Sequence, residues 1–184
     1  MSLSAVRSVV GTPGPTEGRE SGGAFDSLDF RRTLGRFATG VTVVTMVAPD
    51  GEAYGITINA FMSVSLDPPL IAVSLDRSAR AYETMAASER FAVSVLGEHQ
   101  MAVSDRFAGR PVLHDPEPFE EFAGFPVVPG AIAHIVCRMH ASFEAGDHTI
   151  FVGRVEALRT APGDPLIFER GRYTQLEDHK VRVH

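Results

Sequence analysis

The chain has 184 residues, 44% of them hydrophobic and 22% charged, which suits one globular domain with a core and excludes a disordered chain. The formal net charge of -6 argues against binding along the phosphate backbone of a nucleic acid. No apolar run approaches the roughly 20 residues of a membrane-spanning helix, so no membrane contact is expected. The single cysteine, Cys137, rules out an internal disulfide, and residues 1–10 do not form a secretory signal, so the predicted location is the cytoplasm.

The N-terminal segment differs in composition from the rest of the chain. Residues 11–23 are rich in glycine and proline and carry hardly an apolar side chain. Such a segment cannot bury enough surface to offset the entropy lost on ordering. We therefore predict a disordered tail over residues 1–25, a folded domain over 26–178 and a short tail over 179–184. In the domain, Ser27 is expected to cap a helix that ends near Phe37.

Beyond Gly40 the pattern is typical of strands, with β-branched and alternating apolar residues between turn residues. The predicted strands cover residues 41–47, 53–58, 62–66, 70–75, 91–96, 131–144, 148–159, 166–168 and 173–176. Helices are predicted over 78–87 and 98–107, and the proline-rich residues 109–129 are expected to form a long surface excursion. Many closely spaced strands with few helices indicate a mainly β barrel. The glycine motifs of Rossmann and P-loop nucleotide sites are absent.

Two segments near the predicted strand ends have residues suited to binding a nucleotide. Residues 55–65 combine small and short polar side chains around a turn, whose backbone amides can face an acceptor-rich ring or a phosphate. The alternative is an ordinary strand connection. In residues 76–80, Ser78 suits a helix cap, and Arg77 and Arg80 would favour a phosphate. The alternative there is a solvated cap with surface arginines.

Two further candidates lie in the C-terminal half. His148 follows the Gly146-Asp147 turn between two long predicted strands, where it can meet a ligand or simply be an exposed turn histidine. The segment Arg170-Gly171-Arg172-Tyr173 is basic and aromatic, which suits the phosphates and rings of a dinucleotide, although a solvated terminus is the alternative.

The spacing His134-x-x-Cys137-x-x-His140 invites a metal hypothesis, but strand geometry argues against it. On a strand, His134 and His140 share one face, while Cys137 points to the other. We therefore predict a structural role and no metal site. No Ser-His-Asp or paired-carboxylate arrangement stands out, and hydride transfer between cofactors would need neither.

Taken in order, several stretches resemble the short-chain flavin reductase family, the reductase partners of two-component, flavin-dependent monooxygenases. The matching stretches are residues 40–45 (GVTVVT), 55–70 (GITINAFMSVSLDPPL), 91–96 (FAVSVL), 104–109 (SDRFAG), 146–148 (GDH) and 171–173 (GRY). The resemblance covers about residues 26–178. It implies a homodimer of split β-barrels that transfers a hydride from NADH to FAD or FMN and supplies reduced flavin to a monooxygenase. FAD is expected over FMN, and NADH over NADPH, since no extra basic pocket for a 2′-phosphate is visible.

The resemblance also implies residue roles. The isoalloxazine and ribityl chain would be bordered by Thr57, Ile58, Asn59, Ala60, Phe61 and Ser63. The flavin phosphate would be held by Ser74, Arg77, Ser78 and Arg80, and the rest of an FAD would lie along Arg106, Phe107, Ala108 and Gly109. NADH would be placed by His148, Arg170, Gly171, Arg172, Tyr173 and Thr174. Ala60 and Met62 stand where relatives often carry hydroxyls, so flavin contacts there would rest on backbone amides.

Two other functions are compatible with such a barrel. One is an FMN-retaining oxidase of the pyridoxamine-phosphate type, in which the bound flavin is not reduced by NADH. The other is a non-enzymatic flavin-binding module, which would bind flavin without any NADH turnover.

Overall fold

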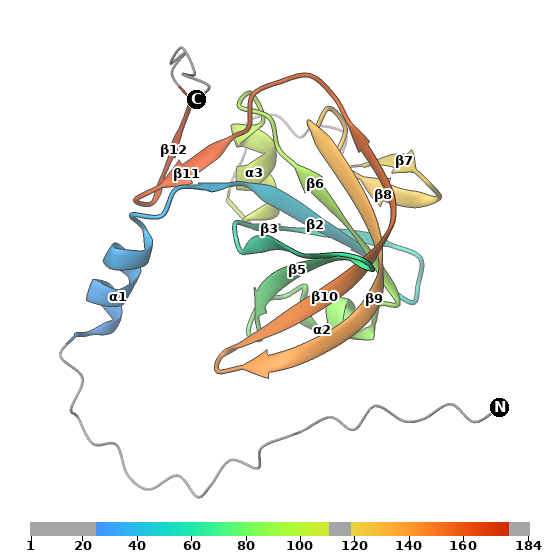
Figure 1. The fold of residues 1–184 in the computed structure, drawn as a ribbon, viewed down its shortest axis with the longest axis horizontal. Helices are drawn as coiled ribbons and strands as arrows, with labels where there is room; N and C mark the ends of the chain where they lie inside the picture. Colours follow the sequence, from blue (N-terminus) through green and yellow to red (C-terminus); the bar gives the residue numbers. More distant parts are fainter. Residues whose placement is uncertain (1–24, 111–118, 177–184) are drawn as a thin grey trace, which may run out of the picture.

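The computed structural model describes residues 25–110 and 119–176 (Figure 1). The predicted N-terminal tail apart from Phe25, the whole predicted C-terminal tail, and residues 111–118 of the predicted excursion lie outside these ranges. The described helices are α1 Ser27–Leu34, α2 Tyr82–Ala87 and α3 Met101–Phe107. The described strands are β1 Thr39–Gly40, β2 Thr42–Val47, β3 Ala53–Ile58, β4 Phe61–Leu66, β5 Pro69–Asp76, β6 Arg90–Val95, β7 Glu120–Phe122, β8 Phe125–Val127, β9 Ala133–Ala145, β10 His148–Thr160, β11 Ile167–Glu169 and β12 Arg172–Thr174.

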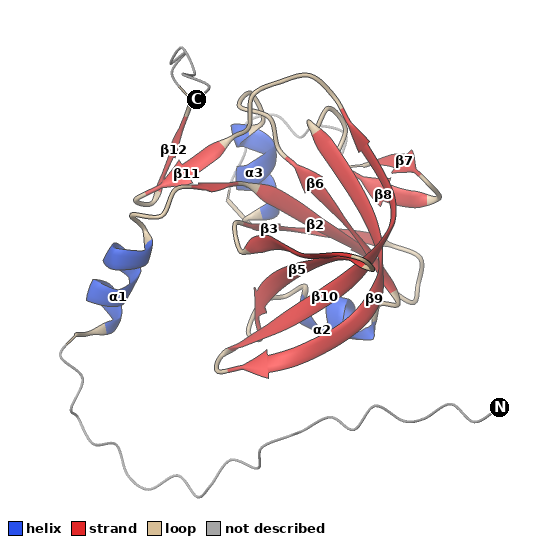
Figure 2. Cartoon of the chain, in the orientation of Figure 1, coloured by secondary structure: helices blue, strands red, loops and turns tan. Residues whose placement is uncertain are grey.

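Strands dominate the fold, as Figure 2 shows, and seven of them form one antiparallel sheet in the order β3-β2-β6-β9-β10-β5-β4. The sheet curls into a barrel, but β3 and β4 remain its two edges although they follow each other in the chain. Asn59 and Ala60 connect these edges. The barrel is therefore split between β3 and β4, as predicted, and the split places this connection at an opening in the sheet.

The core lies on both faces of strand β2, which explains why five successive residues, Thr42 to Met46, are all buried. Val44 belongs to the inner cluster, where it packs with Phe91 among other buried side chains. Its neighbour Val43 points the other way, into a second cluster with Leu96 and Leu166. Alternation along a strand sends successive side chains to opposite faces, so both faces of β2 need cover. Helix α3 and the β11–β12 hairpin supply that cover for the second cluster, through Phe107 and Tyr173 among others.

Two helices begin later than predicted, because other hydrogen bonds hold the residues that precede them. The Asp76 carboxylate accepts from the backbone N–H of Ser78 at 2.7 Å and from its hydroxyl at 2.8 Å, so Ser78 belongs to a turn and α2 begins only at Tyr82. The Glu98 N–H donates to the Asp164 carbonyl at 2.9 Å, and α3 begins at Met101. At α1, the cap is Asp26 rather than Ser27.

The described part of the predicted excursion 109–129 is not a simple surface loop. Strands β7 and β8 form a hairpin whose Phe125 and Val127 are buried against the barrel, so that part of the prediction was wrong. Each strand has only three residues, and Pro126 stands in the middle of β8, so their pattern did not indicate strands.

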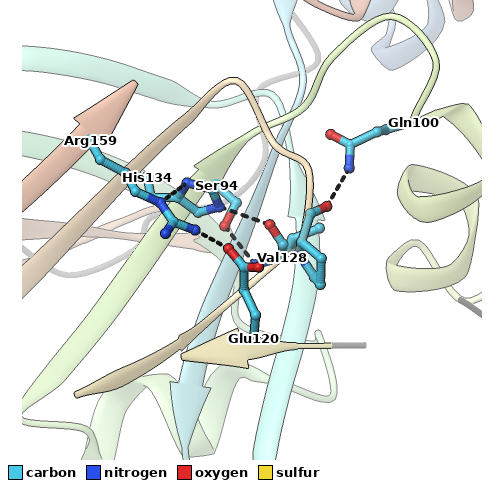
Figure 3. A network of polar contacts seen from close by, with 7 residues as sticks. Ser94, Gln100, Glu120, Val128, His134 and Arg159 are labelled. Carbon is cyan, nitrogen blue, oxygen red and sulfur yellow. Dashed lines mark hydrogen bonds and ion pairs between the residues drawn. The ribbon is translucent and has the colours of Figure 1, made fainter. Parts of the chain in front are cut away.

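His134 anchors the connection after this hairpin (Figure 3). Its ring is 3% exposed, and its Nε2 lies 2.8 Å from the Val128 carbonyl oxygen. Arg159 Nε donates to Nδ1 of the same ring at 3.1 Å, and the Arg159 guanidinium also pairs with Glu120. Since Nδ1 accepts, Nε2 carries the proton that is donated to Val128. His134 therefore has a structural role.

Burial raises the pKa of Cys137 to about 12.

None of the described helices has the length and apolarity of a membrane-spanning segment.

Candidate active site

A hollow of about 170 Å³ lies at the end of β3, beside the opening between β3 and β4. Its lining comes from β3 and the following turn, α3 and the β11–β12 hairpin, with one residue before β2. The lining residues are Val41, Thr57, Ile58, Asn59, Ser104, Ala108, Arg110, Phe168 and Tyr173. Five of these, namely Thr57, Ile58, Asn59, Ala108 and Tyr173, were predicted site residues.

Helix α3 is held against β3 by close packing and a hydrogen bond. A Cβ on Gly55 would lie 2.6 Å from the ring of Phe107, so only glycine lets this ring sit flat on the strand. The Thr57 hydroxyl donates to the Ser104 carbonyl oxygen at 2.7 Å. These contacts place Ala108, the residue that caps the C-terminus of α3, at the rim of the hollow.

The β11–β12 hairpin is fastened to the same helix by Tyr173. The Tyr173 hydroxyl donates to the Asp105 carboxylate at 2.9 Å and lies 2.9 Å from the Ser104 hydroxyl. Burial, with the neighbouring Asp105 carboxylate, raises the pKa of Tyr173. The phenol therefore stays protonated and keeps donating at neutral pH. Its ring packs edge-on against Phe168 at 5.6 Å between centroids, so both rings form one wall of the hollow.

The β3–β4 connection carries two free amides, and its residue Asn59 lines the hollow. Neither the Asn59 nor the Ala60 backbone N–H donates to any group in the described part of the chain. The Ala60 carbonyl is occupied, because it accepts from the Ser74 N–H at 3.0 Å. Two unpaired amide donors at the rim of a hollow can bind the oxygen and nitrogen acceptors of a planar ring. This donor set fits the acceptor edge of a flavin, and it needs no side-chain hydroxyl at position 60.

Other predicted flavin residues lie outside the hollow. Phe61 packs against the inner core cluster, and Ser63 is exposed on edge strand β4. Arg106 has its guanidinium 5.6 Å from the Phe107 ring centroid, beside the helix end. Gly109 takes a φ of 73°, which ends the turn after α3.

A second group of predicted residues gathers where β5 ends. The backbone N–H and the hydroxyl of Ser78 hold the pKa of Asp76 below its usual range. Arg77 donates its backbone N–H to the Asp147 carbonyl at 3.0 Å, and its guanidinium lies 3.5 Å from the Glu144 carboxylate. Arg80 is exposed in the same turn. The two arginines thus stand at the surface beside the β9–β10 turn.

His148 belongs to this second group. It opposes Asp76 in the β5–β10 register, and its Nδ1 lies 2.7 Å from the Asp147 carboxylate. Figure 1 places the β9–β10 turn at one end of the barrel and the β11–β12 hairpin, which carries Arg170 to Thr174, at the other. The residues predicted to place NADH are therefore divided between two ends of one chain, which sequence spacing could not indicate.

Four lining residues were not predicted as site residues: Val41, Ser104, Arg110 and Phe168. Ser104 and Arg110 flank the 105–109 segment, and Arg110 is held by Asp105 at 3.0 Å. A signal for Ser104 existed, since it begins the SDRFAG stretch. The sequence around Phe168 predicted a strand but no site residue, because the place of Phe168 in the hollow depends on how β11 pairs with β1.

The split barrel with a donor-lined hollow at its opening is the architecture of a small flavin-handling oxidoreductase. Residues 34–177 match the model of the family described as "Flavin reductase like domain", and the chain belongs to this family.

Individual relatives agree with this assignment. An NADH-dependent flavin reductase from a Rhodococcus species is 43% identical over 154 residues, covering 82% of this chain and 86% of the relative. The solved structure of the styrene monooxygenase flavin reductase from Pseudomonas putida has a TM-score of 0.75 and 38% identity, covering 81% of this chain and 97% of that one. A Streptomyces globisporus NADH:FAD oxidoreductase was solved in complex with NAD and FAD fragments. Its structure has a TM-score of 0.76 and 35% identity, and the match covers 85% of this chain and 96% of that one.

The Tyr173 hydroxyl should stabilise the hairpin that forms one wall of the hollow. We expect Tyr173→Phe to lower the free energy of unfolding by about 1 kcal/mol, because Asp105 and Ser104 lose a partner. Backbone amides of β11 and β12 should also exchange faster with deuterium. The control is Tyr54→Phe, since Tyr54 is 45% exposed and its hydroxyl has no partner in the described part of the chain. Equal effects in the two variants would show that Tyr173 does not fasten the hairpin.

Proposed function

We propose that this protein is an NADH-dependent flavin reductase, which transfers a hydride from NADH to FAD or FMN and releases the reduced flavin. The observation that carries the proposal is the hollow at the split of the barrel, with two free amide donors beside an aromatic wall, in a chain of the flavin reductase-like family. Two electrons and one proton pass together from NADH to the flavin, leaving NAD⁺.

The protein's contribution is alignment rather than acid–base chemistry. The two cofactors supply the reactivity, so the residues of the hollow need only hold the donor and acceptor atoms about 3–3.5 Å apart. The Asn59 and Ala60 amides would bind the flavin's acceptor edge and stabilise the negative charge that accumulates on the reduced ring. The Tyr173 and Phe168 rings would exclude water from one side of the hollow. Arg77, Ser78 and Arg80 would bind the flavin phosphate.

We infer that FAD is preferred to FMN and NADH to NADPH. The helix end at Arg106 to Gly109 extends beyond the hollow and offers surface for the rest of an FAD. The Streptomyces relative, whose structure contains NAD and FAD fragments, supports the same pair of cofactors. The Pseudomonas relative is named as the reductase of a monooxygenase, which supports a monooxygenase as the acceptor of the reduced flavin.

We infer that the protein acts as a homodimer. An apolar surface of the described chain faces solvent at the edge of the sheet, on strand β4, with Met62 and the 96% exposed Leu66. A two-fold partner would cover both the apolar side chains and the free edge of the sheet. A dimer would also provide a second copy of the residues that one chain divides between its two ends. Sedimentation that showed a fully active, stable monomer at micromolar concentration would contradict this model.

One assay separates the proposed function from its alternatives: NADH oxidation measured with a trace of flavin and with a large excess of flavin. A flavin reductase should oxidise NADH in proportion to added free flavin until the flavin saturates. An FMN-retaining oxidase would keep its flavin oxidised under NADH, and a binding module would show no turnover in either condition. Absence of NADH oxidation with excess FAD and with excess FMN would overturn the proposal.

We expect His148 to serve the nicotinamide more than the flavin. His148→Ala should raise the apparent constant for NADH or slow flavin reduction by up to about a hundredfold, which corresponds to 1–3 kcal/mol for one lost contact. Flavin affinity should change little. Flavin fluorescence reports binding and stopped-flow bleaching reports reduction, since the chain has no tryptophan.

The control is His140→Ala, because His140 is exposed on β9, away from the β5–β10 pairing. The structure places His148 next to Arg77, a candidate phosphate ligand of the flavin, so the opposite result is informative. A tenfold loss of flavin affinity with an unchanged NADH dependence would assign His148 to the flavin site instead.

A further inference from the structure

The end of α1 meets the β11–β12 turn and gathers arginines from both elements. The Arg170 N–H donates to the Gly35 carbonyl at 2.8 Å, and a Cβ on Gly35 would lie 3.6 Å from the Arg170 Cα. Two adjoining depressions, of about 370 and 470 Å³, lie beside this contact, and arginines line both of them. The arginine cluster, as we name it, consists of Arg31, Arg32, Arg36, Arg170 and Arg172.

The charge of this cluster is largely uncompensated. Glu169 pairs with Arg170 at 3.1 Å. In the described ranges, no carboxylate pairs with the other guanidinium groups of the cluster, those of Arg31, Arg32, Arg36 and Arg172. Like charges held this close repel one another, and a bound anion relieves that repulsion. In a chain whose formal net charge is -6, such a concentration of positive charge marks this end of the molecule as an anion-binding surface.

The cluster is continuous with the candidate active site. A third depression, of about 320 Å³, lies between α1 and the hairpin and is lined by Phe30, Leu34 and Phe37 together with Asn59 and Phe168. Asn59 and Phe168 also line the hollow at the split of the barrel, while Arg31 and Arg170 belong to both this depression and the arginine cluster. A path therefore leads from the hollow, across an apolar and aromatic floor, to the arginines.

This order of surfaces matches the chemistry of a dinucleotide substrate. One end of such a molecule is a planar ring, and its other half carries a sugar, a base and phosphate groups with fixed negative charge. Guanidinium groups bind phosphate oxygens through charge-assisted, often bidentate hydrogen bonds, and aromatic rings pack on bases and sugars. The α1 arginines had no sequence signal of their own, since only the docking of Gly35 on Arg170 brings them to the site.

We propose that the arginine cluster binds the phosphate groups on the adenosine half of the nicotinamide dinucleotide, with Arg31 of α1 and Arg36, just after this helix, acting as affinity and specificity determinants. The inference rests on the proposed function and adds α1 to its substrate site. Two phosphate groups have the required chemistry: the diphosphate bridge of NADH and NADPH, and the 2′-phosphate that only NADPH carries. The sequence showed no basic pocket for a 2′-phosphate, and NADH was expected over NADPH for that reason. The arginine cluster is a basic pocket of this kind.

The test uses the double variant Arg31→Gln/Arg36→Gln in the full chain, with Arg154→Gln as the matched control. Arg31 and Arg36 are both exposed, so the substitutions leave the core intact, which circular dichroism verifies. Arg154 is exposed on β10 and has no carboxylate partner among the residues that the structure describes. Titration calorimetry would measure the affinity of ADP-ribose and of 2′-phospho-ADP-ribose, and steady-state kinetics the KM values of NADH, NADPH and flavin.

We expect the double variant to bind the adenosine-side probes roughly tenfold more weakly and to show a similar rise in the dinucleotide KM, with the flavin KM unchanged. Equal losses for both probes assign the cluster to the diphosphate, and a loss confined to the 2′-phosphorylated probe assigns it to that phosphate. Affinities equal to those of Arg154→Gln for both probes would overturn the proposal. Because probe binding needs no flavin reduction, a wild-type protein that binds ADP-ribose but oxidises no NADH would contradict the proposed function and leave this inference standing.

Discussion

The attachment of α3 to the edge of the barrel is the contact on which the candidate site depends. Strand β3 is an edge strand, and an uncovered edge leaves its side chains and amides to solvent. Phe107 covers it by lying on Gly55, and Ser104 then joins three elements, because its carbonyl accepts from Thr57 and its hydroxyl contacts Tyr173. A side chain at position 55 would lift the helix and open the hollow. The same contact therefore closes the second core cluster and shapes the proposed flavin site.

The division of the predicted site between two ends of the chain follows from the topology of the sheet. Strands β5 and β10 carry Arg77 and His148 to one end, while β11 and β12 carry Tyr173 to the other. The β3–β4 connection lies between them and contributes the amides of Asn59 and Ala60. A long cofactor crossing the opening can touch more than one of these groups, and a second subunit would bring another set. The exposed apolar residues of β4 favour such an arrangement energetically, since the burial of apolar surface is the main driving force for association.

Much of the fold could be predicted from the sequence, because its strands have strong local signals. The run through Val43 and Val44 and the two long strands on either side of Gly146 are where the pattern placed them. The first part of α2 was mispredicted because the Asp76 carboxylate binds Ser78 and competes with the helix, a preference that depends on side-chain geometry rather than periodicity. The β7–β8 hairpin escaped prediction for a different reason. Its Phe125 and Val127 become buried only against β6 and β9, a long-range contact that no local pattern encodes.

The size of the hollow has a consequence for the release of product. At about 170 Å³ it is smaller than the roughly 300–1,000 Å³ of pockets that enclose a drug-sized ligand. A flavin at this proposed site would keep much of its surface outside the hollow of a single chain, so its binding would depend on amide contacts and on charge interactions with its phosphates. Contacts of that kind are weakened by water and salt, which permits rapid dissociation. A reductase that supplies free reduced flavin must not bind its product tightly. A shallow hollow with distant arginines meets that requirement better than a deep pocket would, because the positive charge attracts the anionic substrates while the ring remains free to leave.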